Sequence, residues 1–272
     1  MRYILSLLLI IACYGSIIWD ISVETTLGNR YSKIDYLGRN KAVSSAFRKF
    51  WNRNNSLNKG QKKVFPKVKL QVFQNNDESY TWDTDVRYTI DVSDLEDGDS
   101  KYGEINGNEV LLEIEFLPTT DDVEIKKIVN KSVKELENKG LSLLKKSTCF
   151  GCHADKTVLA GPSFSQMAER YEKNTLTINS LARHIKEGST GEWGSIEMPS
   201  HPEFTVEETE QIAEYVLIQG GKKNNWILPG LEGTFRIIKK PDNLFKGIYK
   251  LTASYTSTSS MKGQHSMVLK IK

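Results

Sequence analysis

Cysteine is scarce in this chain, and its scarcity argues against two common roles. The 272 residues include 3 cysteines, 4 histidines and 7 prolines. Exported proteins that depend on disulfides usually carry more cysteines, spread along the chain, so we expect no disulfide framework. Zinc takes four ligands, commonly from two closely spaced Cys or His pairs. The sequence holds one such pair with the later histidines isolated, and a zinc site is therefore not expected.

Charge of one sign is also lacking. The 37 basic and 34 acidic side chains leave a formal net charge of +3. A domain that binds nucleic acid usually concentrates basic residues on one face. The basic cluster at residues 58–63 lies in a polar stretch that is typical of a linker, so we expect no nucleic-acid partner.

The chain begins with an uncharged run, from Tyr3 to Trp19, that follows Arg2. A positive start before an apolar core is typical of an export signal, and this run is only just long enough to span a bilayer. Cys13 ends a stretch that resembles a bacterial lipobox, in which the cysteine is lipidated. The alternative is an uncleaved membrane anchor in which Cys13 is a small buried residue. Both interpretations place the remaining chain outside the cytoplasm, in the periplasm or at the cell surface, and tethered to the membrane.

The spacing of apolar residues changes along the chain and divides it into segments. We expect a signal or anchor at residues 1–19, a polar segment with a linker at 20–65 and a β-sandwich at 66–120. A helical domain is expected at residues 121–224 and a small β module at 225–272. Apolar and polar residues alternate in short runs in the third and fifth segments, which predicts antiparallel strands with one wet face. The sequence therefore predicts a multidomain protein of α and β type.

Helix signals are clearest between the two β segments. Leu176–Glu187 carries apolar residues at helical offsets. Thr205, followed by Glu208, predicts a capping box for a helix that ends at Gly220. In the polar segment, the aromatic spacing of Ala42–Trp51 also favours a short helix.

Two cysteines and a histidine lie within five residues, at Cys149, Cys152 and His153. This spacing fits a redox dithiol, half of a zinc site or a haem attachment point. A redox dithiol would lie between a strand and a helix, whereas here helical patterns flank the motif on both sides. Two thiols that add to the haem vinyl groups, with the histidine below the iron, account for all three side chains.

A second iron ligand has to come from elsewhere, and the candidates are His184, Met198 and His201. Met198 lies in a loop rich in Gly and Pro rather than on an apolar helix face, which favours a ligand over a packing role. His201 is the fallback ligand. His184 is either a group that tunes the reduction potential through its proton or an ordinary surface histidine.

Residues 140–220 resemble the short bacterial class I cytochromes c. The resemblance rests on the cysteine–histidine motif at residues 149–153 and a Gly-Pro pair at 161–162. It also rests on a Gly-Glu-Trp-Gly loop with a following Met-Pro at 191–199 and on a closing helix around 214–217. It implies an all-α domain with one covalent haem c, in which Cys149 and Cys152 carry the thioethers. His153 and Met198 are then the axial ligands of the iron.

The same resemblance implies three supporting residues. In the family, the carbonyl of the Gly-Pro pair, here Gly161 and Pro162, accepts the free N–H of the proximal imidazole, which fixes the ring. Trp193 corresponds to a side chain near a haem propionate. With both axial positions filled, this domain is expected to carry electrons rather than to act as an enzyme.

The flanking segments suggest a context for this domain. Residues 81–118 resemble the PKD-like, immunoglobulin-type domains of bacterial surface proteins. The order of sandwich, cytochrome and β tail is similar to the end of Bacteroidetes proteins that begin with a PQQ-type sugar dehydrogenase. It implies an exported, membrane-tethered monohaem cytochrome that relays electrons from a redox partner, such as a periplasmic sugar dehydrogenase.

Two other functions stay open at this point. The β modules could carry the main role by binding glycan or a surface partner, with Tyr249 and Tyr255 as candidates for stacking on sugars. The other is a haem enzyme or gas sensor. Such a protein would need an open position on the iron, and Met198 as a second ligand argues against one. The acidic stretch Asp94–Asp99 is either a calcium site or a solvated turn.

Overall fold

A computed structural model describes residues 64–73, 80–118, 121, 123, 126–127, 137–240, 242 and 247–271. These residues belong to one compact unit, residues 60–272. The expected signal or anchor at residues 1–19 and the helix at Ala42–Trp51 lie outside the described residues. None of the helices in the described part of the chain is long and apolar enough to cross a membrane.

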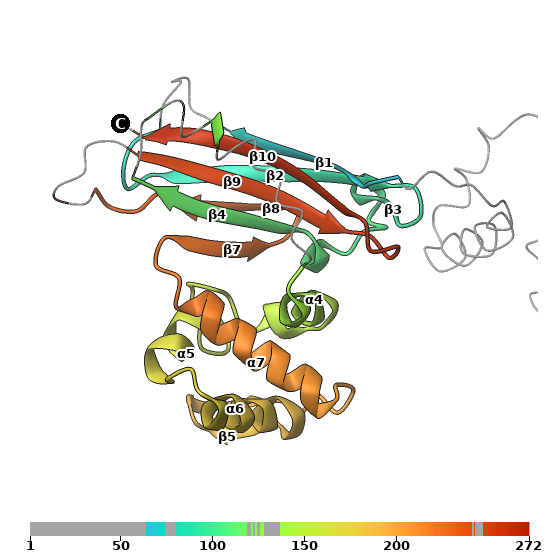
Figure 1. Cartoon of the computed structure of the whole chain (residues 1–272), viewed down its shortest axis with the longest axis vertical. Coiled ribbons are helices and arrows are strands. Elements are labelled where there is room, and N and C mark those ends of the chain that lie inside the picture. Colours follow the sequence, from blue (N-terminus) through green and yellow to red (C-terminus); the bar gives the residue numbers. More distant parts are fainter. Residues whose placement is uncertain are drawn as a thin grey trace, which may run out of the picture. The chain divides into compact units, whose positions relative to one another are not determined.

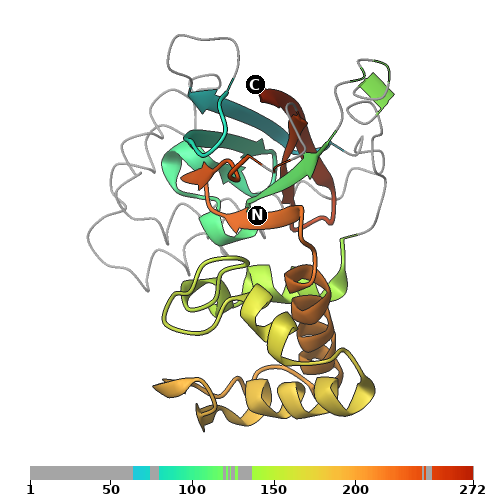
Figure 2. The same cartoon turned by 90° about the vertical axis from the view of Figure 1, so that its left-hand side faces the viewer.

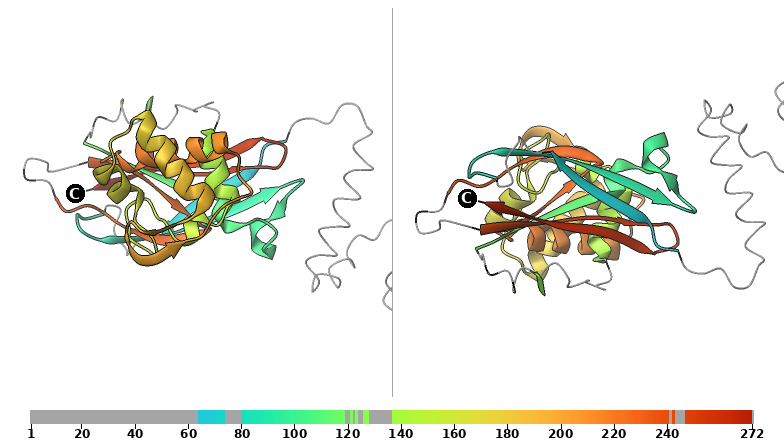
Figure 3. Two further views of the ribbon diagram at one scale, coloured as in Figure 1. Left: turned by 90° about the horizontal axis from the view of Figure 1, so that it is seen from below. Right: turned by 90° about the horizontal axis from the view of Figure 1, so that it is seen from above.

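The described regular structure includes ten strands, four α-helices and three short 3₁₀ helices, and Figure 1 shows how the strands and α-helices are arranged. The strands β1 to β10 are Lys67–Phe73, Asp85–Asp94, Gly98–Asp99, Leu111–Leu117, Ser189–Gly191, Gly194–Met198, Asn225–Pro229, Glu232–Arg236, Gly247–Thr256 and Lys262–Ile271. The helices α4 to α7 are Lys139–Lys146, Phe164–Arg170, Thr175–Glu187 and Val206–Gly220. The helices lie on one side of the sandwich strands in the view of Figure 1, and they overlap the strands in the views from below and from above in Figure 3.

Two antiparallel sheets form a single β-sandwich. One sheet has the order β1-β2-β3 with β8 also paired to β2, and the other has the order β10-β9-β4-β7. Each sheet therefore combines strands from before and after the helical domain. Val86 pairs with Phe235 in the first sheet, and Ile114 lies between Trp226 and Leu251 in the second.

The expected division into an N-terminal sandwich and a separate C-terminal β module is thus wrong. The few strands after residue 225 bury too little apolar surface to be stable alone. In addition, β4 would have both edges unpaired without β7 and β9, and unpaired edges are a liability. The helical domain is an insertion between β4 and β7 of one sandwich.

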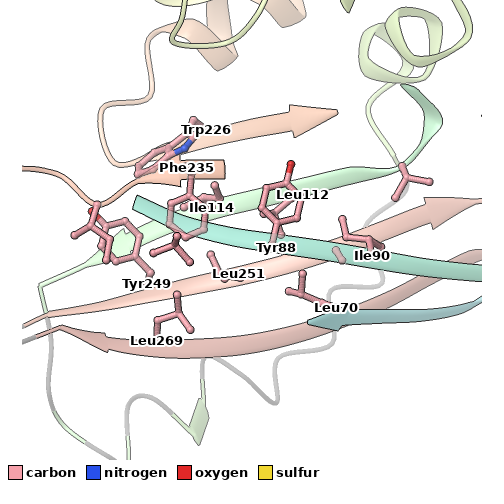
Figure 4. Packing of buried hydrophobic residues seen from close by; sticks show 14 of the residues in the cluster. Leu70, Tyr88, Ile90, Leu112, Ile114, Trp226, Phe235, Tyr249, Leu251 and Leu269 are labelled. Carbon is pink, nitrogen blue, oxygen red and sulfur yellow. The ribbon is translucent and has the colours of Figure 1, made fainter. Parts of the chain in front are cut away.

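The core of the sandwich lies between the two sheets (Figure 4). Every second residue of β9 from Tyr249 to Tyr255 is buried, as the alternation in the sequence predicts. Leu112, Ile114 and Leu251 are 0% exposed, and each such side chain contributes about 1.5–3 kcal/mol relative to an exposed one.

Figure 2 shows the helices of the inserted domain. Capping residues and apolar spacing in the sequence predicted two of them, α6 and α7. The predicted capping box at Thr205 and Glu208 is present and begins α7, which ends at Gly220. The helix predicted at Leu176–Glu187 corresponds to α6. The domain is not all-α as expected, because β5 and β6 form a short antiparallel hairpin.

A second core holds the helical domain together and reaches into the sandwich. It is built around Leu144, Phe164 and Ile212, and it includes Leu111 of β4 and Ile227 of β7. The inserted domain therefore completes its core with side chains from two sandwich strands.

Candidate functional site

The cysteine–histidine motif forms a tight turn after α4. Residues Cys149–Gly151 adopt a single 3₁₀ turn, and the backbone N–H groups of Cys152 and His153 both donate to the carbonyl of Cys149, at 3.1 and 2.9 Å. Both cysteines are free thiols, with Cys149 buried and Cys152 exposed. Burial raises the pKa of the Cys149 thiol, and a hydrogen bond with Ser147 opposes this rise.

One ring nitrogen of His153 contacts the backbone carbonyl of Pro162. His153 Nδ1 lies 2.8 Å from the carbonyl oxygen of Pro162, and because a carbonyl only accepts, Nδ1 carries the proton. Nε2 is then left with a lone pair, as a metal ligand requires. Burial lowers the pKa of His153, which favours the neutral ring, although the Pro162 contact opposes this shift.

Gly161 makes this arrangement sterically possible. A Cβ at this position would collide with the His153 ring, so the backbone can pass the imidazole only where the residue is glycine. The structure thus brings Gly161 and Pro162 to the histidine for two different reasons, one steric and one polar.

Met198 lies at the end of the β5–β6 hairpin rather than in an irregular loop. It pairs with Ser189 across the hairpin, and its half-buried side chain packs against the second core. Gly188 has φ +83° and approaches the carbonyl of Met198 so closely that a Cβ would lie 2.8 Å away. The Gly-rich composition that suggested a loop instead serves a tight hairpin.

Trp193 lies at the turn of the same hairpin and is 37% exposed. The guanidinium carbon of Arg170 lies 4.5 Å from the centre of its ring, and Tyr171 makes an edge contact at 6.1 Å. The Tyr171 hydroxyl is buried and has no hydrogen-bond partner in the described structure. This cluster fixes the indole against the end of α5.

His201 and His184 differ in their surroundings. His201 is 9% exposed, and its Nδ1 lies 2.9 Å from Glu203 Oε1. A positive charge on His201 also favours a lower pKa of His153, as a smaller cause than burial. His184 is partly exposed on α6. The pair of His201 and Glu203 was not predicted, although a histidine and a carboxylate two residues apart were visible in the sequence.

The residues considered for other functions in the sandwich serve its folding. Tyr249 and Tyr255 are 0% and 3% exposed, so neither offers a ring face to a sugar. Asp97 Oδ2 accepts hydrogen bonds from the Tyr255 hydroxyl at 2.9 Å and from the Thr258 N–H at 2.8 Å. In the described part of the chain, no group of three or more His, Cys, Asp or Glu side chains is placed to hold a metal ion.

Comparison with known proteins identifies the helical domain. Residues 138–219 match the family model described as cytochrome c. Cytochrome c-551 of Ectopseudomonas mendocina is 40% identical over 78 residues, which cover 29% of this chain and 94% of that protein. The chain belongs to the cytochrome c family.

Other members of the cytochrome c family show the same extent of similarity. Cytochrome c-551 of Stutzerimonas stutzeri is 39% identical over 82 residues, 30% of this chain and 78% of that protein. The crystal structure of wild-type Nitrosomonas europaea cytochrome c552 is 33% identical, with 28% of this chain and 94% of that chain covered and a TM-score of 0.27. The family match lies within the helical domain, and the resemblance of the sandwich to PKD-like domains stays a prediction.

Membership in the cytochrome c family gives the cofactor and the kind of function. The cofactor is one covalently attached haem c, and the homologues are monohaem electron carriers rather than enzymes. The described residues fit such a group, because two free thiols share one turn with an imidazole whose Nε2 is available. Apolar side chains beside the cysteine–histidine motif and in β6 are also exposed, with Val158 at 55% and Ile196 at 63%, as expected where a large apolar cofactor is bound.

Proposed function

We propose that Cys149 and Cys152 carry the thioether bonds of the haem and that His153 Nε2 and Met198 Sδ are its axial ligands. The observation that supports this proposal most is the 2.8 Å contact between His153 Nδ1 and the Pro162 carbonyl. It leaves Nε2 as the free nitrogen and fixes the plane of the ring. Free thiols at the two cysteines meet the chemical requirement for attachment.

Each protein group has a separate task in this proposal. When bound, the haem supplies a one-electron couple. Pro162 sets the tautomer of His153 and makes the imidazole a better donor. The thioether of Met198 favours the ferrous state and raises the potential relative to two imidazoles. With His153 and Met198 both holding the iron, no position on it would be left for a substrate.

Trp193 has a positioning role in the proposal. Its indole N–H is a donor without an acceptor function, suited to a carboxylate such as a haem propionate. The stacked guanidinium of Arg170, at 4.5 Å, keeps the ring in place. The same guanidinium donates to the Glu192 carbonyl at 2.6 Å, so the hairpin and α5 are joined at this point.

The location of the protein is part of the proposal. The export signal or anchor at residues 1–19 is expected to place the domain in the periplasm or at the cell surface, tethered through lipidated Cys13 or through the anchor itself. This agrees with haem c attachment outside the cytoplasm. The proposed electron donor is a redox protein of the same compartment, such as a PQQ-type sugar dehydrogenase, as implied by the resemblance in the order of the β, helical and β segments of the sequence.

The attachment is tested with the full chain produced in a bacterium that matures c-type cytochromes. We expect haem to remain with the polypeptide after denaturation in the wild type and to be lost in Cys149→Ser/Cys152→Ser. Cys13→Ser serves as the matched control, because it should retain the haem. Its release from the membrane fraction would also favour lipidation over an uncleaved anchor. A wild-type chain without covalent haem would contradict the proposal.

A further inference from the structure

Asp155 is a buried carboxylate two residues after His153, and its burial requires a reason. It is 1% exposed, and an isolated carboxylate at such a site is costly unless it is hydrogen-bonded. Oδ2 accepts from Gln219 Nε2 at 2.8 Å and from the backbone N–H of Ile227 at 2.9 Å. Oδ1 lies 3.8 Å from the ammonium of Lys156 and has no hydrogen bond within the described residues.

The contact with Ile227 crosses from the haem domain to the sandwich. Ile227 lies in β7, which ends the sheet order β10-β9-β4-β7. The outward N–H groups of such a strand have no partner in their own sheet. Asp155 therefore supplies an acceptor that the sheet itself lacks at this position.

The network of hydrogen bonds continues into β4, the strand that pairs with β7 in that sheet. Gln219 Nε2 also lies 3.2 Å from Asn225 Oδ1, and Asn225 Nδ2 donates to Glu113 Oε1 of β4 at 2.7 Å. Asp155 thus stands at one end of a chain of polar contacts that runs through α7 and β7 to β4.

The backbone around Asp155 is held equally firmly on the side of the haem. The carbonyls of Ala154 and Asp155 accept from the N–H groups of Phe164 and Ser165, each at 3.0 Å. His153, immediately before them, is held by Pro162 through its ring. A displacement of β7 must therefore act on the segment that carries the histidine.

We propose that Asp155 is a positioning residue that couples the haem site to the β-sandwich, and that β7 is part of the framework that orients His153. This inference rests on the proposed role of His153. It assigns the sandwich a part in maintaining the geometry of the haem site.

The coupling is tested by reciprocity, since a haem that is stabilised by β7 must in turn stabilise β7. Amide hydrogen exchange is measured in the full chain with haem and in haem-free Cys149→Ala/Cys152→Ala. We expect the Ile227 amide to exchange about ten-fold more slowly with haem, the size of one hydrogen bond. The Val92 amide, which donates to Ser100 Oγ at 2.9 Å in the other sheet, is the internal reference and should change less.

Variants of Asp155 separate coupling from a simple loss of stability. In Asp155→Ala the dependence of Ile227 exchange on haem should disappear, and the hyperfine-shifted proton resonances of the His153 ring in the ferric protein should move. Asp155→Asn keeps the size and one acceptor, and should restore both in part. Asp91→Asn removes an exposed carboxylate of β2 and should leave both unchanged.

Two results would overturn the coupling. One is equal Ile227 exchange in the wild type with haem and in haem-free Cys149→Ala/Cys152→Ala. The other is a wild-type resonance pattern in Asp155→Ala. If Asp155→Ala fails to fold, the wild-type comparison and Asp155→Asn still decide. In all these cases haem remains attached to the wild type, so the result is distinct from failure of the proposed function, in which no covalent haem forms.

Discussion

The β-sandwich and the haem domain are stabilised in different ways. Among the described residues, the sandwich core contains 19 buried ones from segments on both sides of the insertion. The core of the haem domain contains 11, and two of these, Leu111 and Ile227, belong to the sandwich. The sandwich therefore holds a complete core of its own, whereas the haem domain depends on side chains from its neighbour and, by our proposal, on a cofactor. We therefore expect the haem domain to lose stability when the sandwich is destabilised, and the sandwich to lose less when the haem domain is destabilised.

The largest effect should follow from a cavity in the sandwich. Leu112 is 0% exposed, and Leu112→Ala should cost about 2–5 kcal/mol of unfolding free energy. Because β4 also supplies Leu111 to the second core, the haem domain should lose stability as well. Thermal unfolding followed by far-UV circular dichroism for the strands and by haem absorbance would show both midpoints fall. An unchanged haem midpoint would contradict the unequal dependence.

A smaller and more local effect is expected from Gly161→Ala. The added Cβ collides with the His153 ring, so the ring must shift and the contact with Pro162 weakens. Such overpacking costs about 1–3 kcal/mol, and it should lower the haem midpoint while leaving the strand midpoint in place. Gly151→Ala is a matched control, because a Cβ there has no neighbour within 4 Å. Equal effects of the two variants would argue against the packing described here.

The two regions should also respond differently to pH when haem is absent. Burial depresses the pKa of His153 in the fold below its ordinary value of 6.5. Below that value the unfolded chain binds the proton more readily than the folded one, so stability is lost as pH falls. In Cys149→Ala/Cys152→Ala, unfolding between pH 7 and 5 should show this loss in the helices. Adding His153→Gln should reduce the slope, and an unaltered slope would exclude His153 as its source.

The smallest effect is expected at the edge of the haem site. Arg170→Ala removes the guanidinium from the Trp193 ring, a contact worth about 0.5–1 kcal/mol where it is exposed. Unfolding should change little, whereas the fluorescence anisotropy decay of the protein should show a freer indole. Lys173→Ala, which removes an exposed ion pair with Glu214 at 3.7 Å, is the control. A Trp193 as rigid in Arg170→Ala as in the wild type would show that the hairpin alone holds it.

Local signals in the sequence predicted most of the elements. The capping box at Thr205 depends on residues three apart, and the alternation that indicated β9 depends on neighbours two apart. The short cysteine–histidine motif also indicated the cofactor. In each of these cases the interacting groups lie close together in the chain.

The pairing of distant segments could not be predicted in this way. β7 is a five-residue strand, Asn225–Pro229, whose partner in β4 lies more than a hundred residues earlier, and nothing in its local pattern specifies that partner. Asp155 was missed for a related reason, because an acidic residue after a polar motif indicates a solvated position. The approach of two donors that are distant in the sequence, the Gln219 amide and the Ile227 N–H, makes it a buried acceptor.

The most direct test of the central claim is the optical spectrum of the ferric, haem-loaded protein. Ferric haem with a thioether ligand shows a weak long-wavelength band. We predict this band in the wild type, its loss in Met198→Ala and its retention in His201→Ala. A wild-type spectrum without the band, with high-spin iron that binds carbon monoxide readily, would contradict His153 and Met198 as the axial ligands and would reopen the case for an open iron site.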